Sequence, residues 1–190
     1  MKTNLRIAIL FTIVTTVVFG LVYPLGVTGL AQLLFPSKAN GSLLVRNGRV
    51  IGSKLLGQPF SSPGHFHSRP SSAGTGYDAS QSSGSNLGPT NHQLIERVKA
   101  DVEKLRAENP GVPVPIDLVS ASASGLDPEI SPAAAEFQIP RVARERGMNE
   151  ADVRALVQKH TLGRQFSFLG EPRVRVLELN LDLDEVHPSH

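Results

Sequence analysis

Two histidines and a short serine–glycine segment are the first residues of this chain whose types and spacing could do chemistry. His65 and His67 lie two positions apart, so on a strand they would point to the same side, as a pair of metal ligands does. No convincing third ligand accompanies them. The plainer interpretation, two histidines in a polar loop, is favoured, and we predict no metal site.

The segment Ser83-Gly84-Ser85-Asn86 could offer backbone N–H groups to an anion. The favoured alternative is a tight turn shaped by glycine and asparagine. The stretch 52–58 has the glycine spacing of a P-loop, but Gln58 stands where a lysine must reach the phosphates. The residues alone therefore predict no independent nucleotide site.

Nucleophilic catalysis lacks the groups that it needs. The chain has no cysteine, which excludes thiol catalysis, thiolate metal sites and disulfides, and suits an oxidising exterior. Asp117, Asp127 and Glu129 have serines nearby, but no neighbouring histidine completes a triad. We predict no catalytic residue, no cofactor of its own and no catalysis by the chain alone.

A long polar loop, Ser61–Pro89, must position most of these residues. Its composition is typical of disorder. Phe66, Tyr77 and Leu87 are nevertheless spaced as anchors, and long loops in compact domains are usually either functional or disordered. We favour an ordered, functional loop.

The clearest helix follows this loop, at Thr90–Asn109. Thr90 and Gln93 form a capping box at its start. One apolar stripe at helical spacing comprises Leu94, Ile95, Val98, Val102 and Leu105.

Two further helices are predicted. Ser131-Pro132 is a typical helix start, and this helix should reach Gly147 with a kink at Pro140. Asn149 should cap the next helix, Glu150–His160.

The strands are shorter. Asn47-Gly48 predicts a tight hairpin within Ser42–Ser53. A short strand is expected at 55–60 and an extended segment at 112–120. Alternation over Arg173–Leu183 predicts a final strand, with a β-bulge or burial of both faces where the parity changes at Val176-Leu177. The soluble part is thus predicted as one α+β domain, a small, mainly antiparallel sheet with about three helices on one face.

An uncharged, apolar stretch, Ile7–Phe35, precedes this domain. It exceeds the roughly 20 residues that a helix needs to cross a bilayer. Pro24 should kink or end its straight part, and Tyr23 suits the membrane interface. A cleaved signal peptide is the alternative, but its apolar region would be about half as long. We predict an uncleaved transmembrane helix that extends no further than Phe35-Pro36.

The charges set the expected topology. Lys2 and Arg6 favour a cytoplasmic N-terminus; four basic residues after the helix pull the other way, but long domains translocate largely regardless of charge. We therefore expect a single-pass protein of the cell (inner) membrane, with residues 1–6 cytoplasmic, 7–35 transmembrane and 36–190 an extracytoplasmic soluble domain.

The charge balance also bears on partners. Of the 19 basic residues, two precede the apolar helix, which leaves 17 basic against 17 acidic residues in the remainder. A nucleic-acid surface needs a basic excess, so no nucleic-acid partner is expected.

Several motifs together are typical of one family. They are Gly52-Ser53-Lys54-Leu55-Leu56-Gly57-Gln58, Phe66-His67-Ser68-Arg69-Pro70-Ser71, Gly84-Ser85-Asn86-Leu87-Gly88-Pro89, Ser124-Gly125-Leu126-Asp127-Pro128-Glu129-Ile130-Ser131-Pro132 and Leu169-Gly170-Glu171-Pro172-Arg173-Val174. On these motifs the chain resembles the C subunit of the Kdp-type potassium-transporting P-type ATPase, over nearly its full length. It departs at Ser68 and in Ser82-Ser83, where the family usually has a glycine.

The resemblance implies a non-catalytic accessory subunit of a high-affinity, ATP-driven potassium uptake complex. The expected partners are a channel-like potassium-binding subunit, a P-type ATP-hydrolysing subunit and, as a further candidate, a small fourth membrane subunit. The family is described as a catalytic chaperone that raises the ATP affinity of the hydrolytic subunit, so ATP is expected only within that complex.

The same resemblance gives two sets of candidate contact residues. Nucleotide or partner contact is assigned to Ser83, Gly84, Ser85 and Asn86, because this loop has been compared with the ABC-transporter signature. The charged residues of the motifs, Arg69, Asp127, Glu171 and Arg173, are candidates to face a partner.

Two alternatives stay open. An extracytoplasmic domain has no access to cytoplasmic ATP, so the domain could instead be a cap or gate over the external mouth of the channel-like subunit. A membrane-anchored periplasmic binding module or enzyme, of a different class, would have the same layout.

Overall fold

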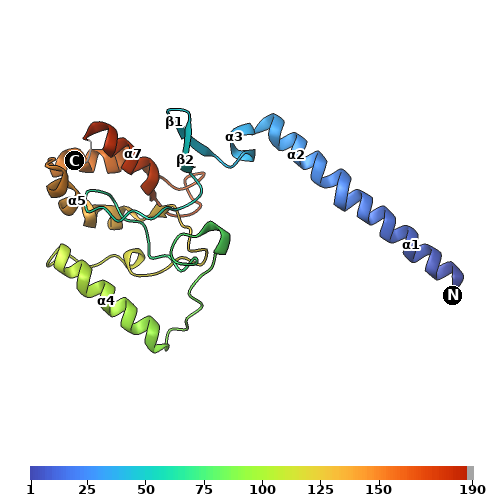
Figure 1. The fold of residues 1–190 in the computed structure, drawn as a ribbon, viewed down its shortest axis with the longest axis horizontal. Coiled ribbons are helices and arrows are strands. Elements are labelled where there is room, and N and C mark those ends of the chain that lie inside the picture. Colours follow the sequence, from blue (N-terminus) through green and yellow to red (C-terminus); the bar gives the residue numbers. More distant parts are fainter. Residues whose placement is uncertain (188–190) are drawn as a thin grey trace. The chain divides into compact units, whose positions relative to one another are not determined.

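The computed structural model describes residues 1–187 and divides the chain into two units, Met1–Ile51 and the residues from Gly52 onward (Figure 1). The first unit begins with α1 (Lys2–Val17), the π turn η1 (Val18–Val22) and α2 (Tyr23–Leu34). Together they form one apolar helix of 33 residues, whose most apolar 18-residue window has a mean hydropathy of 2.3, and which is long enough to cross a membrane. The predicted apolar helix is confirmed.

Proline 24 affects this helix differently from the prediction. The helix neither stops nor breaks there, because Pro24 lies in the first turn of α2, after a turn of π-helix. In that turn Tyr23 N–H bonds the carbonyl of Val18, five residues back. The helix does end before Phe35-Pro36, as predicted, because the residue before a proline avoids helical geometry.

A hairpin follows the short helix α3 (Pro36–Ala39). Its strands are β1 (Leu43–Arg46) and β2 (Arg49–Ser53). Asn47 and Gly48 have φ values of +51° and +73°, as a tight type I′ turn requires. The hairpin prediction is confirmed.

The second unit contains a three-stranded antiparallel sheet of order β3-β5-β4. The strands are short: β3 (Glu129–Ile130), β4 (Thr161–Leu162) and β5 (Arg173–Arg175). Val174 of β5 faces Ile130 on one side and Thr161 on the other. The predicted α+β class, with a small antiparallel sheet, is confirmed.

Two predicted helices cover the core of this unit. Helix α5 (Pro132–Arg146) begins at the predicted cap, where Ser131 Oγ accepts from Ala134 N–H at 3.0 Å, and runs on through Pro140. Helix α6 (Glu150–Lys159) is capped by Asn149, as predicted. Their apolar faces pack with β5 around a core of Phe66, Phe137, Ile139, Val142, Val153, Val174, Leu179 and Leu183.

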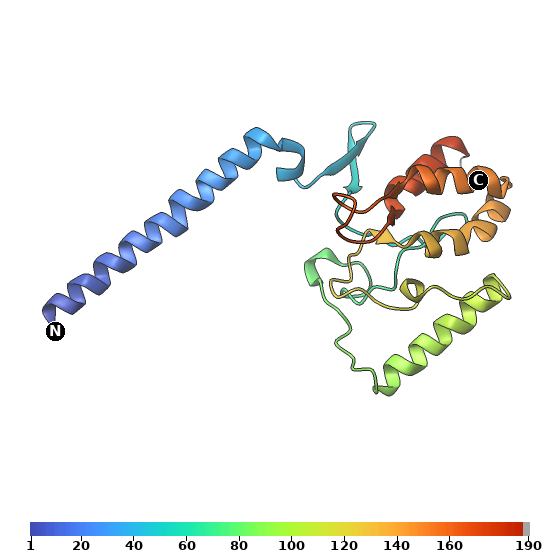
Figure 2. The same ribbon diagram turned by 180° about the vertical axis from the view of Figure 1, so that it is seen from behind.

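The helix α4 (His92–Glu108) lies apart from α5–α7 in both views (Figures 1 and 2). Its cap is Asn91 rather than the predicted Thr90, because Asn91 Oδ1 accepts from Gln93 N–H at 2.8 Å. The residues of the predicted apolar stripe are half-buried, apart from the exposed Ile95, and no residue of α4 is fully buried. Arg97 anchors it through a bond to the carbonyl of Val119, and Asn109 through a bond to that of Phe137.

The predicted final strand is wrong beyond Arg175. The chain leaves β5 and turns into a fourth helix, α7 (Val176–Val186). Val176, Leu179, Asn180 and Leu183 are buried at helical spacing, so the same leucines fit both periodicities. Leucine and glutamate, good helix formers, replace the β-branched residues after Val176, which favours the helix.

Two smaller predictions also need correction. The segment 55–60 is not a strand, because β2 ends in a turn in which Leu55 N–H bonds Ser53 Oγ. The segment 112–120 is extended only in part and contains the 3₁₀ turn η3 (Ile116–Leu118). A second 3₁₀ turn, η2 (Ala79–Gln81), lies in the long polar loop.

Candidate functional site

Two buried amides hold the polar loop 61–89 in place. Asn180 Oδ1 accepts from Phe66 N–H at 2.8 Å, and its Nδ2 donates to the carbonyl of Phe66 at 2.9 Å. Gln138 bonds the backbone of His67 in the same way: its Oε1 accepts from His67 N–H at 2.7 Å, and its Nε2 donates to the carbonyl of His67 at 3.1 Å. Each side-chain amide therefore makes the two backbone hydrogen bonds that a neighbouring strand would make. These bonds explain why the loop is ordered although its composition is typical of disorder.

Two arginines of α5 fasten the start of this loop. Arg141 donates to the carbonyls of Pro63 and His65 and lies 3.2 Å from Glu108 Oε2. Burial lowers the pKa of Arg141, and the carboxylate of Glu108 offsets part of that effect. The start of the loop is thus held by the buried guanidinium groups of two arginines of α5.

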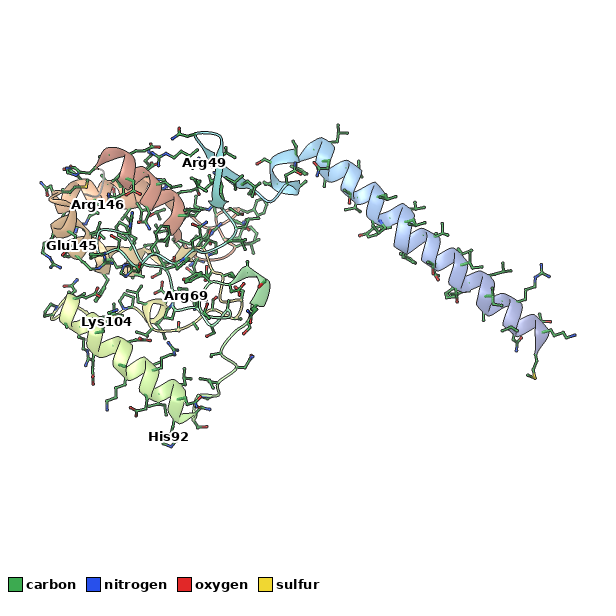
Figure 3. All side chains as sticks on the ribbon, in the orientation of Figure 1. Arg49, Arg69, His92, Lys104, Glu145 and Arg146 are labelled. Carbon is green, nitrogen blue, oxygen red and sulfur yellow. The ribbon has the colours of Figure 1, made fainter. Side chains whose placement is uncertain are left out.

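Arg146 is the more deeply buried of the two, with 1% of its side chain exposed. It donates to the carbonyls of Gly64 and His187, each at 2.5 Å, and pairs with Asp184 at 2.6 Å. Figure 3 labels Arg146 and its neighbour Glu145. His65 Nε2 lies 3.0 Å from the same carboxylate. Arg146 therefore joins the loop to the end of α7.

The two histidines do not form the same-side pair that a metal would need. His65 faces Asp184, whereas His67 Nε2 lies 3.0 Å from the carbonyl of Ser62. Within residues 1–187 no three histidine, aspartate or glutamate side chains gather as metal ligands.

His67 gives a pH prediction. Burial and then the charge of Arg141 lower its pKa, against a smaller opposing effect from Ser62 and Glu108, with Lys104 also nearby. Because the folded chain resists protonation below about pH 6.5 and the unfolded chain does not, folding stability should fall as the pH drops through this range.

We expect His67→Gln to remove that part of the pH dependence. Urea unfolding of the full chain in mild detergent, at about pH 7.5 and about pH 5.5, measures it. His92→Gln, at an exposed position on α4, is the control and should behave as wild type. An equal loss of stability in wild type and His67→Gln would contradict the prediction.

The motif around Arg69 and the motif around Asp127 are joined by an ion pair and by hydrogen bonds. Arg69 Nη1 bonds Asp127 Oδ2 at 2.9 Å, and its other nitrogens donate to Ser120 O and Oγ at 3.3 Å. Tyr77 donates its hydroxyl proton to the carbonyl of Arg69. Ser71 Oγ donates to Gly125 O at 2.6 Å. These bonds bring the two motifs together in one site, although they lie more than 50 positions apart in the sequence.

Two glycines of the motifs are required by close backbone approach. A Cβ on Gly57 would lie 2.4 Å from the carbonyl oxygen of Asp127. Gly125 has φ of +68°, and a Cβ there would lie 2.7 Å from Ala73 N. In the P-loop-like stretch 52–58, Gly57 therefore allows packing against the Asp127 segment, whereas Gly52 lies against Gln58 and Leu177.

The segment Ser83–Asn86 packs on the neighbouring turn. A Cβ on Gly84 would lie 3.0 Å from Ala123 O, and Ser83 Oγ bonds Gly84 O at 3.1 Å. Asn86 is exposed with φ of +52°. The predicted tight turn is therefore wrong: Ser83, Gly84, Ser85 and Asn86 form an irregular segment without turn geometry, and positive φ occurs only at Asn86.

The four charged candidates line one open groove of about 480 Å³. Arg69 and Asp127 form one pair on it, and Arg173 pairs with Glu129 at 2.8 Å. Glu171 lies on the rim and pairs with Arg164. The apolar part of the lining consists of Pro115, Ile116, Ile130, Ala133 and Pro172.

The groove suits contact with another macromolecule. Ile116, on its lining, has 78% of its surface exposed, although it is a large apolar side chain. Asp117 accepts from Ser131 N–H and Oγ, so this carboxylate and serine cap α5. The carboxylates and serines that a triad would need are thus already bonded in structural roles.

The sequence analysis did not identify the polar residues of α5 and α7 that hold the loop 61–89 in place. Gln138, Arg141 and Arg146 are polar residues of an otherwise ordinary helix, and Asn180 was expected on a strand. Their signal was weak: three buried polar positions share the helical spacing of the apolar face of α5.

The fold and groove define a class, an α+β domain with an open groove that follows one long apolar helix. The comparisons with known proteins name the family. The family model "K+-transporting ATPase, c chain" matches residues 5–185. The chain therefore belongs to this family, which confirms the resemblance.

Curated relatives agree over their whole length. A "Potassium-transporting ATPase KdpC subunit" of Koribacter versatilis is 62% identical over 188 residues, covering 99% of this chain and 97% of the relative. One of Acidobacterium capsulatum is 60% identical, covering 97% of this chain and 99% of the relative. One of Rhodopseudomonas palustris (strain BisB5) is 55% identical, covering 97% and 98%.

Proposed function

We propose that this chain is a non-catalytic accessory subunit of a high-affinity, ATP-driven potassium uptake complex. Its apolar helix would cross the cell membrane once, with residues 1–6 in the cytoplasm and the domain outside. One observation carries the proposal: charged residues from separate family motifs converge on one groove beside the exposed Ile116. Such a surface is made for a protein partner, here the channel-like or the ATP-hydrolysing subunit.

The effect on ATP would be indirect. A domain on the outer side cannot reach cytoplasmic ATP, so a rise in the ATP affinity of the hydrolytic subunit would pass through contacts between subunits. The segment 83–86 is not part of the groove lining. In this proposal it shapes the Gly125 region, and ATP is bound by the hydrolytic subunit.

Ile116→Asp tests the groove. Because the side chain is 78% exposed, the change should leave the fold intact. A charge in an apolar contact should lower recovery of the complex at least about tenfold, as loss of an interface hot spot does. Co-purification of the full chain with the larger subunits measures recovery, and ATPase assays of the complex that remains give the KM for ATP.

Val112→Asp is the matched control, an exposed valine four residues earlier and not part of the groove lining. It should leave both quantities unchanged. Normal recovery and a normal KM for ATP in Ile116→Asp would rule out the groove as the contact. Reduced recovery with a normal KM would support a role in assembly and speak against the chaperone role.

A cap or gate over the ion-entry mouth is the second candidate. Of the four carboxylates in the groove lining, Asp127, Glu129 and Glu171 pair with arginines, whereas Asp117 bonds Ser131. The remaining negative charge favours cations nearby. A changed apparent potassium affinity in Ile116→Asp, with a normal KM for ATP, would favour this alternative. Membership of the family speaks against a stand-alone binding module or enzyme.

A further inference from the structure

The connection between β4 and β5 ends in a tight turn with two exposed phenylalanines. Gln165 N–H bonds Leu169 O at 2.8 Å, and Leu169 N–H bonds Gln165 O at 2.9 Å. Between them, Phe166 and Ser167 have φ values of +51° and +69°. Left-handed geometry at a bulky residue such as Phe166 is uncommon and unfavourable.

The exposure of this turn is the second unusual feature. Phe166 has 81% of its surface exposed, Phe168 70% and Leu169 48%. By contrast, Phe66 and Phe137 are buried in the core. A chain that holds large aromatic side chains in solvent on a strained turn indicates a binding role for them.

We propose that Phe166 and Phe168 are anchors that insert into an uncharged apolar pocket on another protein subunit of the same complex. This inference rests on the proposed function. The turn leads directly into Glu171, Pro172 and Arg173, which line the groove. A subunit seated on the groove would therefore meet the turn at the groove's edge.

The charges near the turn favour a protein over a lipid surface. Loops that bind anionic membranes combine apolar tips with free lysines or arginines. Here Arg164, at the base of the turn, pairs with Glu171 at 2.6 Å, and Arg173 pairs with Glu129. The base of the turn is thus electrically balanced, which suits an uncharged pocket.

Photo-crosslinking identifies what the turn contacts. A benzophenone analogue of phenylalanine at position 168 keeps an aromatic side chain, so the fold and contact should persist. In the full chain within the membrane complex, we expect an adduct with another subunit. An adduct with lipid, an adduct with a second copy of this chain, or no adduct would overturn the proposal.

The double variant Phe166→Ser/Phe168→Ser measures the contribution of the anchors. Co-purification should fall at least about tenfold, equivalent to about 1.4 kcal/mol, because two aromatic side chains lose their apolar contact. Val186→Ser, at another exposed apolar position, is the control and should co-purify normally. Ser167→Gly, which keeps both phenylalanines, should also co-purify normally.

Equal recovery of the double variant and wild type would overturn the inference. It would leave the proposed function standing, because the wild-type chain would still bind its partners. Failure of the wild-type chain to co-purify with any larger membrane subunit would instead defeat the proposed function itself.

Discussion

Replacing Arg146 by alanine is expected to destabilise the soluble domain by about 2–4 kcal/mol, because several backbone carbonyls and one partly exposed carboxylate lose their buried cationic donor. The side chain is 1% exposed, and its removal leaves the carbonyls of the buried residues Gly64 and Leu183 without this donor. Because Asp184 is 34% exposed, its lost charge pairing is partly screened. Most of the loss should therefore come from the unsatisfied carbonyls.

Urea unfolding of the full chain in mild detergent measures this loss, and hydrogen exchange locates it. The pKa of Asp184 offers a separate readout: burial raises it, but bonds from Arg146 and His65 hold it below the ordinary value. It should rise in Arg146→Ala. The control is Arg144→Ala, on the same helix and 65% exposed, which should change stability by no more than about 0.5 kcal/mol. Equal effects of the two substitutions would contradict the prediction.

Phe66→Ala is expected to cost about 3–5 kcal/mol, as do other substitutions of a buried phenylalanine by alanine. Phe66 has no exposed surface, and the amide of Asn180 fixes its backbone on both sides. The surrounding groups therefore cannot easily close the cavity. Hydrogen exchange should show faster exchange along residues 61–89, because the loop loses its one fully buried large apolar side chain.

Phe166→Ala provides the comparison, since the same side chain is removed from an 81% exposed position. It should change the free energy of unfolding by no more than about 0.5 kcal/mol. A loss below about 1 kcal/mol in Phe66→Ala would mean that the loop is not anchored as described.

Local signals were sufficient where one segment determines its own structure. Ser131, Pro132 and Gly147 mark both ends of α5, and Asn47-Gly48 fixes the hairpin. They were insufficient at α7, where leucines at alternate positions satisfy a strand and a helix equally. Burial of Asn180 against Phe66 distinguishes the two, and this contact joins residues 114 positions apart.

The arrangement of the charged motif residues was not predictable from the sequence. The motifs contain Arg69, Asp127, Glu171 and Arg173, yet nothing local indicates that they line one groove. Their convergence depends on the pairing of β5 with β3 and on the bond from Arg69 to Asp127. The aromatic turn was missed because no periodicity marks an exposed phenylalanine.

The bonds that shape the polar loop have a consequence for how the protein is made. Within residues 1–187, the side chains that bond the backbone of residues 63–67 come from later in the chain, at Gln138, Arg141, Arg146 and Asn180. Arg146 in turn bonds the carbonyl of His187. While a ribosome is still adding α7, the loop has neither Asn180 nor this last carbonyl. A nascent or truncated chain would therefore lack the finished loop and groove, so only completed chains would be ready for assembly with other subunits.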